Sequence, residues 1–272
     1  MAEEAKKAEL SIEEVLASTS IADVYQAAKQ LDGVAKKTHL VESPYFSDLC
    51  GNNVYLKPEN LQNTGSFKLR GAYNKISQLN ENERKRGVIT ASAGNHAQGV
   101  AFAARALNCK AVICMPATTP ILKVEATRAY GAEVVLYGDS FDDAYAKSLE
   151  LQKKKGYVYI HPFNDQKVLA GQGTTALEII DELKDVDAIL VPIGGGGFAS
   201  GVALATKAVN PNVKVIGVEP EGAPCMEKSF MEGHVTTLPA VDTVADGCAV
   251  KTPGDLTYAF CKKYLDQIIT VS

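Results

Sequence analysis

Short runs of apolar, mostly β-branched residues alternate along the chain with longer stretches in which apolar residues recur at helical spacing. The expected strands cover residues 53–56, 87–90, 111–115, 133–137, 157–160, 188–193, 214–218 and 267–271. Between most of them lie stretches of helical spacing, such as 97–107 and 142–153. Alternating strands and helices with apolar strands imply parallel sheets that helices cover on both faces. The pattern therefore predicts an α/β fold.

One helix can be located at both ends. It is expected over residues 21–31, where Ser20 suits the N-cap position and Asp23 complements the positive end of the helix dipole. Gly33 follows as a natural stop. No linker rich in proline, glycine or serine divides the 272 residues, so any division into domains must come from the chain crossing between sheets.

The composition is that of an ordinary globular protein. Hydrophobic residues make up 46% and charged residues 22%, which argues against disorder and coiled coil. The formal net charge is -4 with no long basic block, which argues against nucleic acid as a partner. Arg105 and Lys110 interrupt the most apolar stretch, residues 99–117, so no membrane span is expected.

The N-terminus and the cysteines favour a cytoplasmic protein. The first ten residues, MAEEAKKAEL, lack the apolar core of a secretory signal. Six cysteines are scattered without a C-x-x-C pair: Cys50, Cys109, Cys114, Cys225, Cys248 and Cys261. We expect reduced thiols rather than a disulfide framework or a metal site.

The first of three segments with candidate chemistry runs from Pro58 to Gly71. It is rich in Asn, Thr, Gly and Ser before Lys68, where a helix over about 68–79 is expected to begin. A lysine in the first helical turn faces the positive end of the dipole, which lowers the pKa of its amine and makes it a better nucleophile. Taken alone, the segment also fits an exposed lysine that is merely tolerated at a helix start.

The second segment, TASAGNHAQG, covers residues 90–99 between an expected strand and helix. Its small residues would let backbone N–H groups at the helix N-terminus approach an anion such as a substrate carboxylate. Asn95 and His96 add side-chain hydrogen-bonding groups. The alternative is a tight turn in which Asn95 only caps the helix.

The third segment, GGGGFASG, begins at Gly194 between an apolar strand and a helix. Bare backbone N–H groups and the helix dipole favour a phosphate cradle over a flexible linker. The same residues fit a G-x-G-x-x-A dinucleotide-binding fingerprint, with Glu219 after the next strand as the acid for a ribose. That alternative leaves the first two segments without a purpose.

Together, these segments resemble those of the fold-type II pyridoxal-phosphate (PLP) enzymes. The greatest similarity is to the threonine dehydratases, or threonine ammonia-lyases, of the serine/threonine dehydratase family. NTGSFKLRGAYNKI resembles the motif around the cofactor lysine, SAGNHAQGVA the substrate loop and PIGGGGFASG the phosphate loop. Further matches are GQGTTALEI at 171–179, VEPEG, and ADGCAV at 245–250. The resemblance extends from about Ile21 onward, and the joint order of the motifs is highly specific.

The resemblance implies roles for individual residues. Lys68 is expected to bind PLP covalently and to be the catalytic base, with Phe67 against the pyridine ring and Asn95 hydrogen-bonded to its 3-hydroxyl. The backbone of a glycine loop, residues 194–198, is expected to hold the phosphate: Gly194, Gly195, Gly196, Gly197 and Phe198. The substrate carboxylate site is expected to be lined by Ser92, Gly94, Asn95 and His96, with Thr64 and Ser66 nearby.

The implied reaction is β-elimination and deamination of L-threonine and L-serine, which yields 2-oxobutanoate or pyruvate and ammonia. The implied fold is two open, mostly parallel twisted sheets with helices on both faces, similar to tryptophan synthase β. We expect a larger phosphate-binding domain from residues 1–60 and 158–272 and a smaller inserted domain from 61–157. Expected partners are the amino-acid substrate and further copies of the chain, in a dimer or tetramer.

A related branch, the serine racemases, is a second possibility. That branch carries a proton-transfer serine directly before the Gly-Asn-His of the substrate loop, where this chain has Ala93. Its divalent metal site would also be incomplete here, because Glu219 is followed six residues later by Cys225 instead of aspartate. We therefore expect elimination without appreciable racemisation, and no metal.

The resemblance implies a longer chain than the one given. The family continues into a segment where a serine hydrogen-bonds the pyridine nitrogen, and in some members into a regulatory domain. This sequence ends at Ser272. We expect the 272-residue chain to bind PLP weakly and to have little activity.

Overall fold

Helices and strands alternate through residues 12–272, the part of the chain that the computed structural model describes. The helices are α1 Ile12–Ala17, α2 Ile21–Leu31, α3 Pro44–Cys50, α4 Lys68–Ser77, α5 Glu81–Arg86, α6 Asn95–Ala106, α7 Ile121–Ala129, α8 Phe141–Lys155, α9 Gln166–Glu182, α10 Gly197–Val209, α11 Cys225–Glu232 and α12 Asp255–Tyr264. Two short 3-10 helices are η1 Glu59–Leu61 and η2 Asp246–Cys248. The predicted first helix coincides with α2, whose N-terminus is closed by a hydrogen bond from the Ser20 N–H to Asp23 Oδ2 (2.7 Å).

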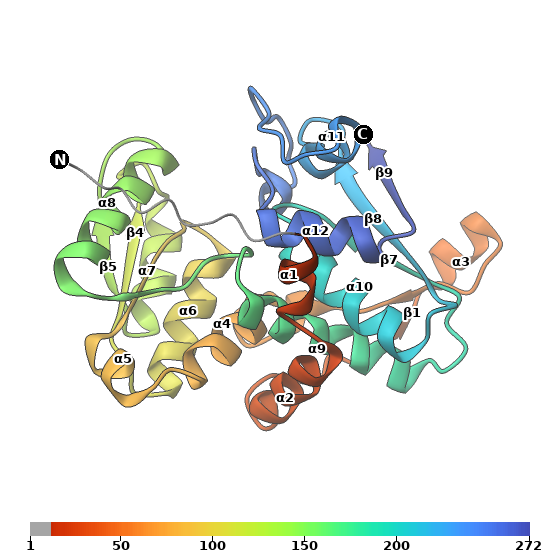
Figure 1. Cartoon of the computed structure of the whole chain (residues 1–272), viewed down its shortest axis with the longest axis horizontal. Helices are drawn as coiled ribbons and strands as arrows, with labels where there is room; N and C mark the ends of the chain where they lie inside the picture. Colours follow the sequence, from red (N-terminus) through yellow and green to blue (C-terminus); the bar gives the residue numbers. More distant parts are fainter. Residues whose placement is uncertain (1–11) are drawn as a thin grey trace.

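A four-stranded parallel sheet forms the centre of one unit, drawn at the left of Figure 1. Its strands are β3 Val88–Ala91, β4 Ala111–Met115, β5 Glu133–Leu136 and β6 Val158–Tyr159, in the order β5-β4-β3-β6. Val88 and Ile113 face a core with α4 and α6, whereas Ile89 and Val112 face a separate core with α8. Helices therefore cover both faces of this sheet, as its continuously apolar strands predicted.

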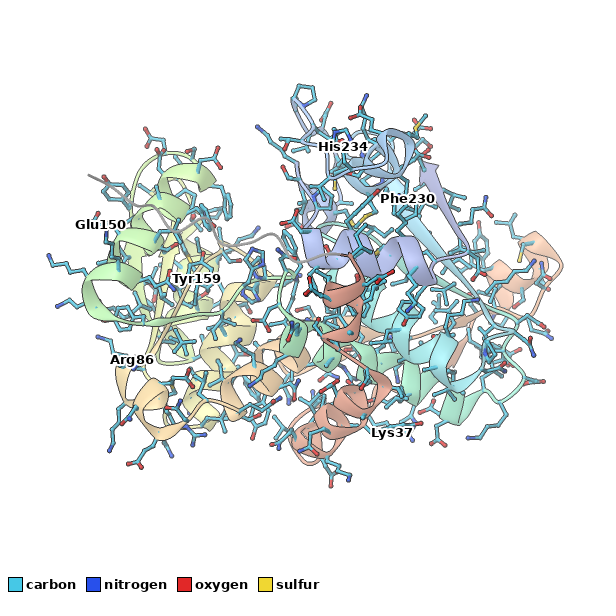
Figure 2. The ribbon with its side chains drawn as sticks, viewed as in Figure 1. Lys37, Arg86, Glu150, Tyr159, Phe230 and His234 are labelled. Atoms are coloured by element: carbon cyan, nitrogen blue, oxygen red, sulfur yellow. The ribbon has the colours of Figure 1, made fainter. Side chains whose placement is uncertain are left out.

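A three-stranded parallel sheet forms the centre of the second unit, drawn at the right of Figure 1. Its strands are β7 Ala188–Pro192, β8 Lys214–Pro220 and β9 Gln267–Val271, in that order. Ile189 and Val191 are buried in a core shared with α2, α9, α10 and α12. Leu190 between them is 62% exposed, so the other face of the sheet is open at β7. In Figure 2 the labelled Tyr159 belongs to the first unit and Phe230 to the second.

Within residues 12–272, the one departure from parallel pairing is a two-stranded antiparallel ribbon of β1 Val41–Glu42 and β2 Tyr55–Leu56. The strand expected over 53–56 is present only as β2, and β1 was not predicted. Helix α3 connects the two strands and lies at the right-hand end of the molecule in Figure 1.

Helix α9 joins the two units, because it packs closely on α4 from the first side and on α10 from the second. A Cβ atom at Gly171 would lie 2.6 Å from the carbonyl oxygen of Arg70, and one at Gly173 would lie 2.8 Å from that of Gly201. Only glycine permits these approaches. The two glycines of GQGTTALEI therefore set how closely the helices around the site can pack.

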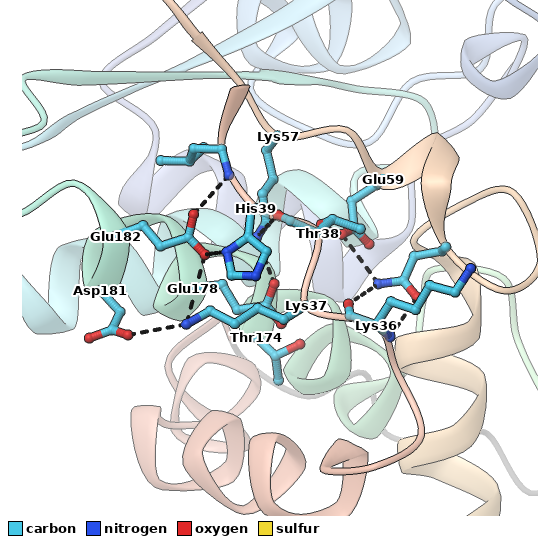
Figure 3. Close-up of polar contacts among 12 residues, drawn as sticks. Lys36, Lys37, Thr38, His39, Lys57, Glu59, Thr174, Glu178, Asp181 and Glu182 are labelled. Atoms are coloured by element: carbon cyan, nitrogen blue, oxygen red, sulfur yellow. Dashed lines mark hydrogen bonds and ion pairs between the residues drawn. The ribbon is translucent and has the colours of Figure 1, made fainter. Parts of the chain in front are cut away.

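A buried ion network fixes the start of α4 against α9. The Arg70 side chain is 1% exposed; its Nε lies 2.8 Å from Glu59 Oε2 and its Nη1 lies 2.6 Å from Glu178 Oε1. Lys57 Nζ lies 2.7 Å from Glu178 Oε2. Figure 3 shows the adjoining contacts, in which Lys37 and His39 of the preceding connection pair with Asp181 and Glu182 at the end of α9. These contacts hold the backbone leading to Lys68 in one place.

Three further observations bear on the class of protein. Among residues 12–272, no helix is both long and apolar enough to cross a membrane. All six cysteines are free thiols. Within the same described range, no cluster of three or more His, Cys, Asp or Glu side chains is arranged to hold a metal ion.

Candidate active site

Lys68 is the first residue of α4, and its side chain is partly buried between the two units. Its Nζ donates a hydrogen bond to the carbonyl oxygen of Pro162 (2.8 Å). Burial lowers the pKa of the Lys68 amine to about 8, because a desolvated ammonium is disfavoured, and the nearby Cys248 opposes this lowering. The predicted lowering of the pKa is therefore present, but burial is its main cause instead of the helix dipole.

The connection from β6 to α9, residues 160–164, forms a wall beside Lys68 that was not predicted from the sequence. His161 Nδ1 accepts the backbone N–H of Asn164 (2.8 Å), so the wall is held by its own side chain. Burial lowers the pKa of His161 to about 4, Asp165 raises it, and the charge of Lys68 lowers it further. The only signal for this wall was its position at the end of an expected parallel strand, where α/β proteins place ligands.

His96, in the first turn of α6, lies on the same wall. Its Nε2 lies 2.9 Å from the carbonyl oxygen of Ile160, and its Nδ1 has no partner among the described residues. Burial and the charge of Lys68 lower the pKa of His96 to about 3. The ring is therefore neutral near pH 7: Nε2–H donates to Ile160, and Nδ1 is left as a buried acceptor for a ligand.

The other predicted substrate residues gather around the same point. Gly99 of α6 packs on α4, since a Cβ there would lie 3.0 Å from the Leu69 nitrogen, and this brings the 92–96 loop to the start of α4. Within that loop, Ser92 Oγ accepts the Gly94 N–H (3.3 Å). Asn95 begins α6 and is exposed. The predicted Thr64 and Ser66 are buried in the turn before Lys68, where Ser66 Oγ accepts the Lys68 N–H (3.4 Å).

The glycine loop, residues 194–198, leads from β7 into α10. Gly196 has φ +90°, which favours glycine, and a Cβ at Gly195 would lie 2.3 Å from the ring of Phe163 in the wall. No residue within 12–272 accepts the backbone N–H groups of residues 195–198. Unpartnered N–H groups at a helix N-terminus are suited to binding an anion.

The segment ADGCAV, residues 245–250, lies on a third side of the site, beside the glycine loop and Lys68. A Cβ at Gly194 would lie 2.8 Å from the carbonyl oxygen of Gly247, so this segment packs on the glycine loop. Cys248 is partly buried and close enough to Lys68 for each to affect the other's pKa. Asp246 reaches the first unit, where its Oδ2 lies 3.4 Å from Lys123 Nζ. Cys248 was not among the predicted site residues, although its motif was noted.

These residues fit PLP. The cofactor needs an amine that can link to its aldehyde, and Lys68 has a lowered pKa. It also needs an anion site, which the free N–H groups of the glycine loop supply. The unpartnered His96 Nδ1 and Thr64 Oγ1 are buried polar atoms that a ligand could satisfy.

The dinucleotide alternative does not fit. Glu219 is 0% exposed, and its carboxylate accepts the backbone N–H groups of Met226 (2.9 Å) and Glu227 (2.8 Å) at the start of α11. Burial raises the pKa of Glu219 to about 7. A carboxylate used to hold a neighbouring helix is not available to a ribose, so this alternative is wrong.

Comparison with known proteins agrees with the geometry. A family profile described as pyridoxal-phosphate dependent enzyme matches residues 31–272. The chain is 51% identical over 253 residues to the L-threonine ammonia-lyase of Thermotoga maritima, covering 93% of this chain and 63% of that protein. It is 47% identical to the L-threonine dehydratase catabolic TdcB of Escherichia coli K12, covering 93% of this chain and 77% of that protein.

Solved structures show the same relationship. The processed form of threonine deaminase isoform 2 from Solanum lycopersicum superposes with a TM-score of 0.91 at 47% identity, covering 97% of this chain and 71% of that one. Maize serine racemase superposes with a TM-score of 0.91 at 36% identity, covering 93% and 77%. The chain thus spans about two thirds to three quarters of the length of these relatives. It belongs to the pyridoxal-phosphate dependent enzyme family, as its motifs predicted.

Proposed function

We propose that the protein containing this sequence catalyses the PLP-dependent deamination of L-threonine and L-serine to 2-oxobutanoate and pyruvate. The observation that carries the proposal is the position of the Lys68 amine. It has a pKa of about 8 and is held beside the wall of residues 160–164, near the glycine loop. The relatives named threonine ammonia-lyase and threonine dehydratase support this substrate class. The chemistry would serve isoleucine biosynthesis or threonine catabolism.

The proposed roles follow from position. PLP, when bound, would withdraw electrons from the substrate α-carbon. Lys68 would hold the cofactor covalently and, once released by the substrate amine, would accept the α-proton at Nζ. The N–H groups of residues 195–198 would bind the phosphate. Phe67 and Asn95 would contact the ring and its 3-hydroxyl.

The substrate carboxylate would lie at the N-terminus of α6. The residues proposed to line its site are Thr64, Ser66, Ser92, Gly94, Asn95 and His96. His96, which is buried and neutral, would offer its free Nδ1 as an acceptor to a donor group of the substrate, such as the β-hydroxyl, because the carboxylate has no hydrogen to donate. Closure of these groups around the substrate would exclude water from the reacting carbon.

We further propose the two-domain division of the chain. The sheet of β3 to β6 supports a smaller inserted domain, and the sheet of β7 to β9 supports a larger one, for which the expected bounds were 1–60 and 158–272. The expected boundary at residue 157 lies directly before β6, which pairs with β3. We therefore place the end of the smaller domain after Tyr159.

A homo-oligomer, either dimer or tetramer, in the cytoplasm is also proposed. Free thiols suit a reducing compartment. Helix α3 exposes apolar side chains, with Tyr45 and Leu49 each 72% exposed. Exposed apolar groups of this kind are typical of surfaces that become covered. Sedimentation velocity would measure the oligomeric state.

Borohydride reduction of the PLP-loaded protein, followed by peptide mass spectrometry, tests the cofactor assignment. Reduction should leave a pyridoxyl group on the peptide that contains Lys68. Lys68→Ala should lose both this adduct and the release of 2-oxobutanoate from L-threonine. Lys75→Ala, on the same helix, is the matched control and should keep both. A reducible adduct that persists in Lys68→Ala would contradict the assignment.

A further inference from the structure

Two backbone carbonyl groups of the glycine loop contact side chains that have no role in the proposed cofactor site. Thr257 Oγ1, from α12, donates to the carbonyl oxygen of Gly195 (2.6 Å). Cys225 Sγ, at the start of α11, lies 3.4 Å from the carbonyl oxygen of Gly194. Both side chains are fully buried. Two consecutive carbonyl groups of the loop thus have side-chain donors from different helices.

The direction of these carbonyl groups decides the direction of the N–H groups. In a trans peptide, the C=O of one residue and the N–H of the next point in opposite directions. When Cys225 holds the Gly194 carbonyl, the Gly195 N–H must point away from α11. When Thr257 holds the Gly195 carbonyl, the Gly196 N–H must point away from α12. Both N–H groups belong to the set without a protein acceptor.

The two donors are themselves fixed. Thr257 Oγ1 accepts the Gly254 N–H (3.0 Å), and its own hydrogen has the Gly195 carbonyl oxygen as the nearer acceptor (2.6 Å) and the Gly254 carbonyl oxygen as the farther one (3.1 Å). Burial and the neighbouring Glu219 raise the pKa of the Cys225 thiol to about 12, so the thiol keeps its proton. Its Sγ lies 3.4 Å from the Gly194 carbonyl oxygen and 3.7 Å from Glu219 Oε1, so the carbonyl is the nearer acceptor. Glu219 holds the first N–H groups of α11 and thereby places Cys225 under the loop.

We propose that Thr257 and Cys225 are positioning residues that aim the N–H groups of Gly196 and Gly195 at the cofactor phosphate. This inference rests on the proposed PLP site. Neither side chain touches the cofactor; each acts through one peptide group of the loop. Without a donor on the carbonyl side, a glycine-rich peptide can rotate, and the N–H groups would no longer be aligned before the ligand arrives.

The test compares the binding of PLP with that of pyridoxal, which lacks the phosphate. Apoprotein is titrated with each compound, and the dissociation constant is obtained from the change in protein fluorescence. Thr257→Val and Cys225→Ala should each weaken PLP binding by roughly 3- to 10-fold, as expected for one lost hydrogen bond. Pyridoxal binding should not change, because pyridoxal makes no use of the aligned N–H groups.

Matched variants separate the hydrogen bond from packing. Thr257→Ser and Cys225→Ser keep a donor and should retain most of the PLP affinity. Thr206→Val is the control, because Thr206 is a fully buried threonine on α10 whose hydroxyl has no partner among the described residues. It should bind PLP as the unaltered chain does. Thermal melting of each apoprotein identifies variants that fail to fold, for which the serine variants decide the question.

Several outcomes would overturn the inference. Equal weakening of PLP and pyridoxal binding would mean that the residues only support the fold. Serine variants as weak as Thr257→Val would exclude the hydrogen bond as the cause. Unchanged PLP binding in every variant would leave the cofactor site intact and remove the positioning role alone. An unaltered chain that binds no PLP would remove the proposed cofactor site and this inference together.

Discussion

The ring of Phe67 stacks on the ring of Phe198, with their centroids 4.0 Å apart and their planes 12° from parallel. Phe67 directly precedes Lys68, and Phe198 lies in the first turn of α10, after the four glycines. The stack therefore connects the two segments that would hold opposite ends of the cofactor. Whether Phe67 also contacts the pyridine ring stays a prediction.

A double-mutant cycle should detect this stack in the free energy of unfolding. Aromatic pairs contribute about 0.5–1.5 kcal/mol beyond the area that they bury, so Phe67→Ala and Phe198→Ala should be coupled by that amount. Urea denaturation of the two single variants and the double variant gives the coupling. Phe67→Ala combined with Phe230→Ala is the control, because Phe230 packs on Tyr258 in α12. A coupling for Phe67 and Phe198 as small as that of the control would show that the stack adds nothing.

The reactivity of Lys68 should depend on pH with a midpoint near 8. Only the unprotonated amine attacks an aldehyde, and at pH 7 a pKa of about 8 leaves about a tenth of the amine unprotonated. Below the midpoint, the rate of covalent PLP attachment should therefore rise about tenfold for each unit of increase in pH, and above the midpoint it should level off. Stopped-flow absorbance of apoprotein mixed with PLP measures the rate. A rate that still rises steeply above pH 9 would show that the amine has an ordinary pKa.

Much of the sheet structure was predictable from local sequence. The runs at 111–115 and 267–271 coincide with β4 and β9, because each is a compact apolar run bounded by polar or turn residues. The ribbon of β1 and β2 was not predictable in the same way. Val41–Glu42 contains no run of its own and is a strand only because it pairs with Tyr55–Leu56, fourteen or so positions along the chain. Such short pairs are decided by tertiary contacts.

The site was predictable in its three segments but not in the residues that surround them. His96 and the glycine loop each follow an expected parallel strand, β3 and β7, so each lies at the carboxyl end of its own sheet, whereas Lys68 follows the antiparallel strand β2. Pro162 and Phe163 contact Lys68 and the glycine loop only because β6 ends beside the start of α4. The sequence pattern of residues 160–164 contains no signal for this contact with the start of α4. For the same reason, the sequence suggested a helix dipole as the cause of the low pKa of Lys68, whereas burial is the main cause.

Arg70→Met should strongly destabilise the protein. The substitution would leave Glu59 and Glu178 without their buried partner, and breaking a buried ion pair from one side costs about 3–5 kcal/mol. Arg128→Met removes an exposed pair with Glu125 and should cost less than about 1 kcal/mol. Urea denaturation measures both. A loss for Arg70→Met no larger than that for Arg128→Met would mean that the network contributes little to the position of α4.

Ala93→Ser should shift the reaction towards racemisation. Residue 93 lies between Ser92 and Gly94 in the loop that carries the proposed substrate site, at the position where the serine racemases carry a proton-transfer serine. A hydroxyl there would supply the second proton-transfer group that alanine lacks, so the α-carbon could be protonated from its other face. Chiral chromatography of the products from L-serine, together with pyruvate release, gives the ratio of the two reactions.

The unaltered chain should form pyruvate with little D-serine, and Ala93→Ser should raise the D-serine share. Ala91→Ser, at the buried end of β3, is the control and should leave the ratio unchanged. D-serine formed by the unaltered chain as fast as pyruvate would show that a group other than residue 93 serves the second face.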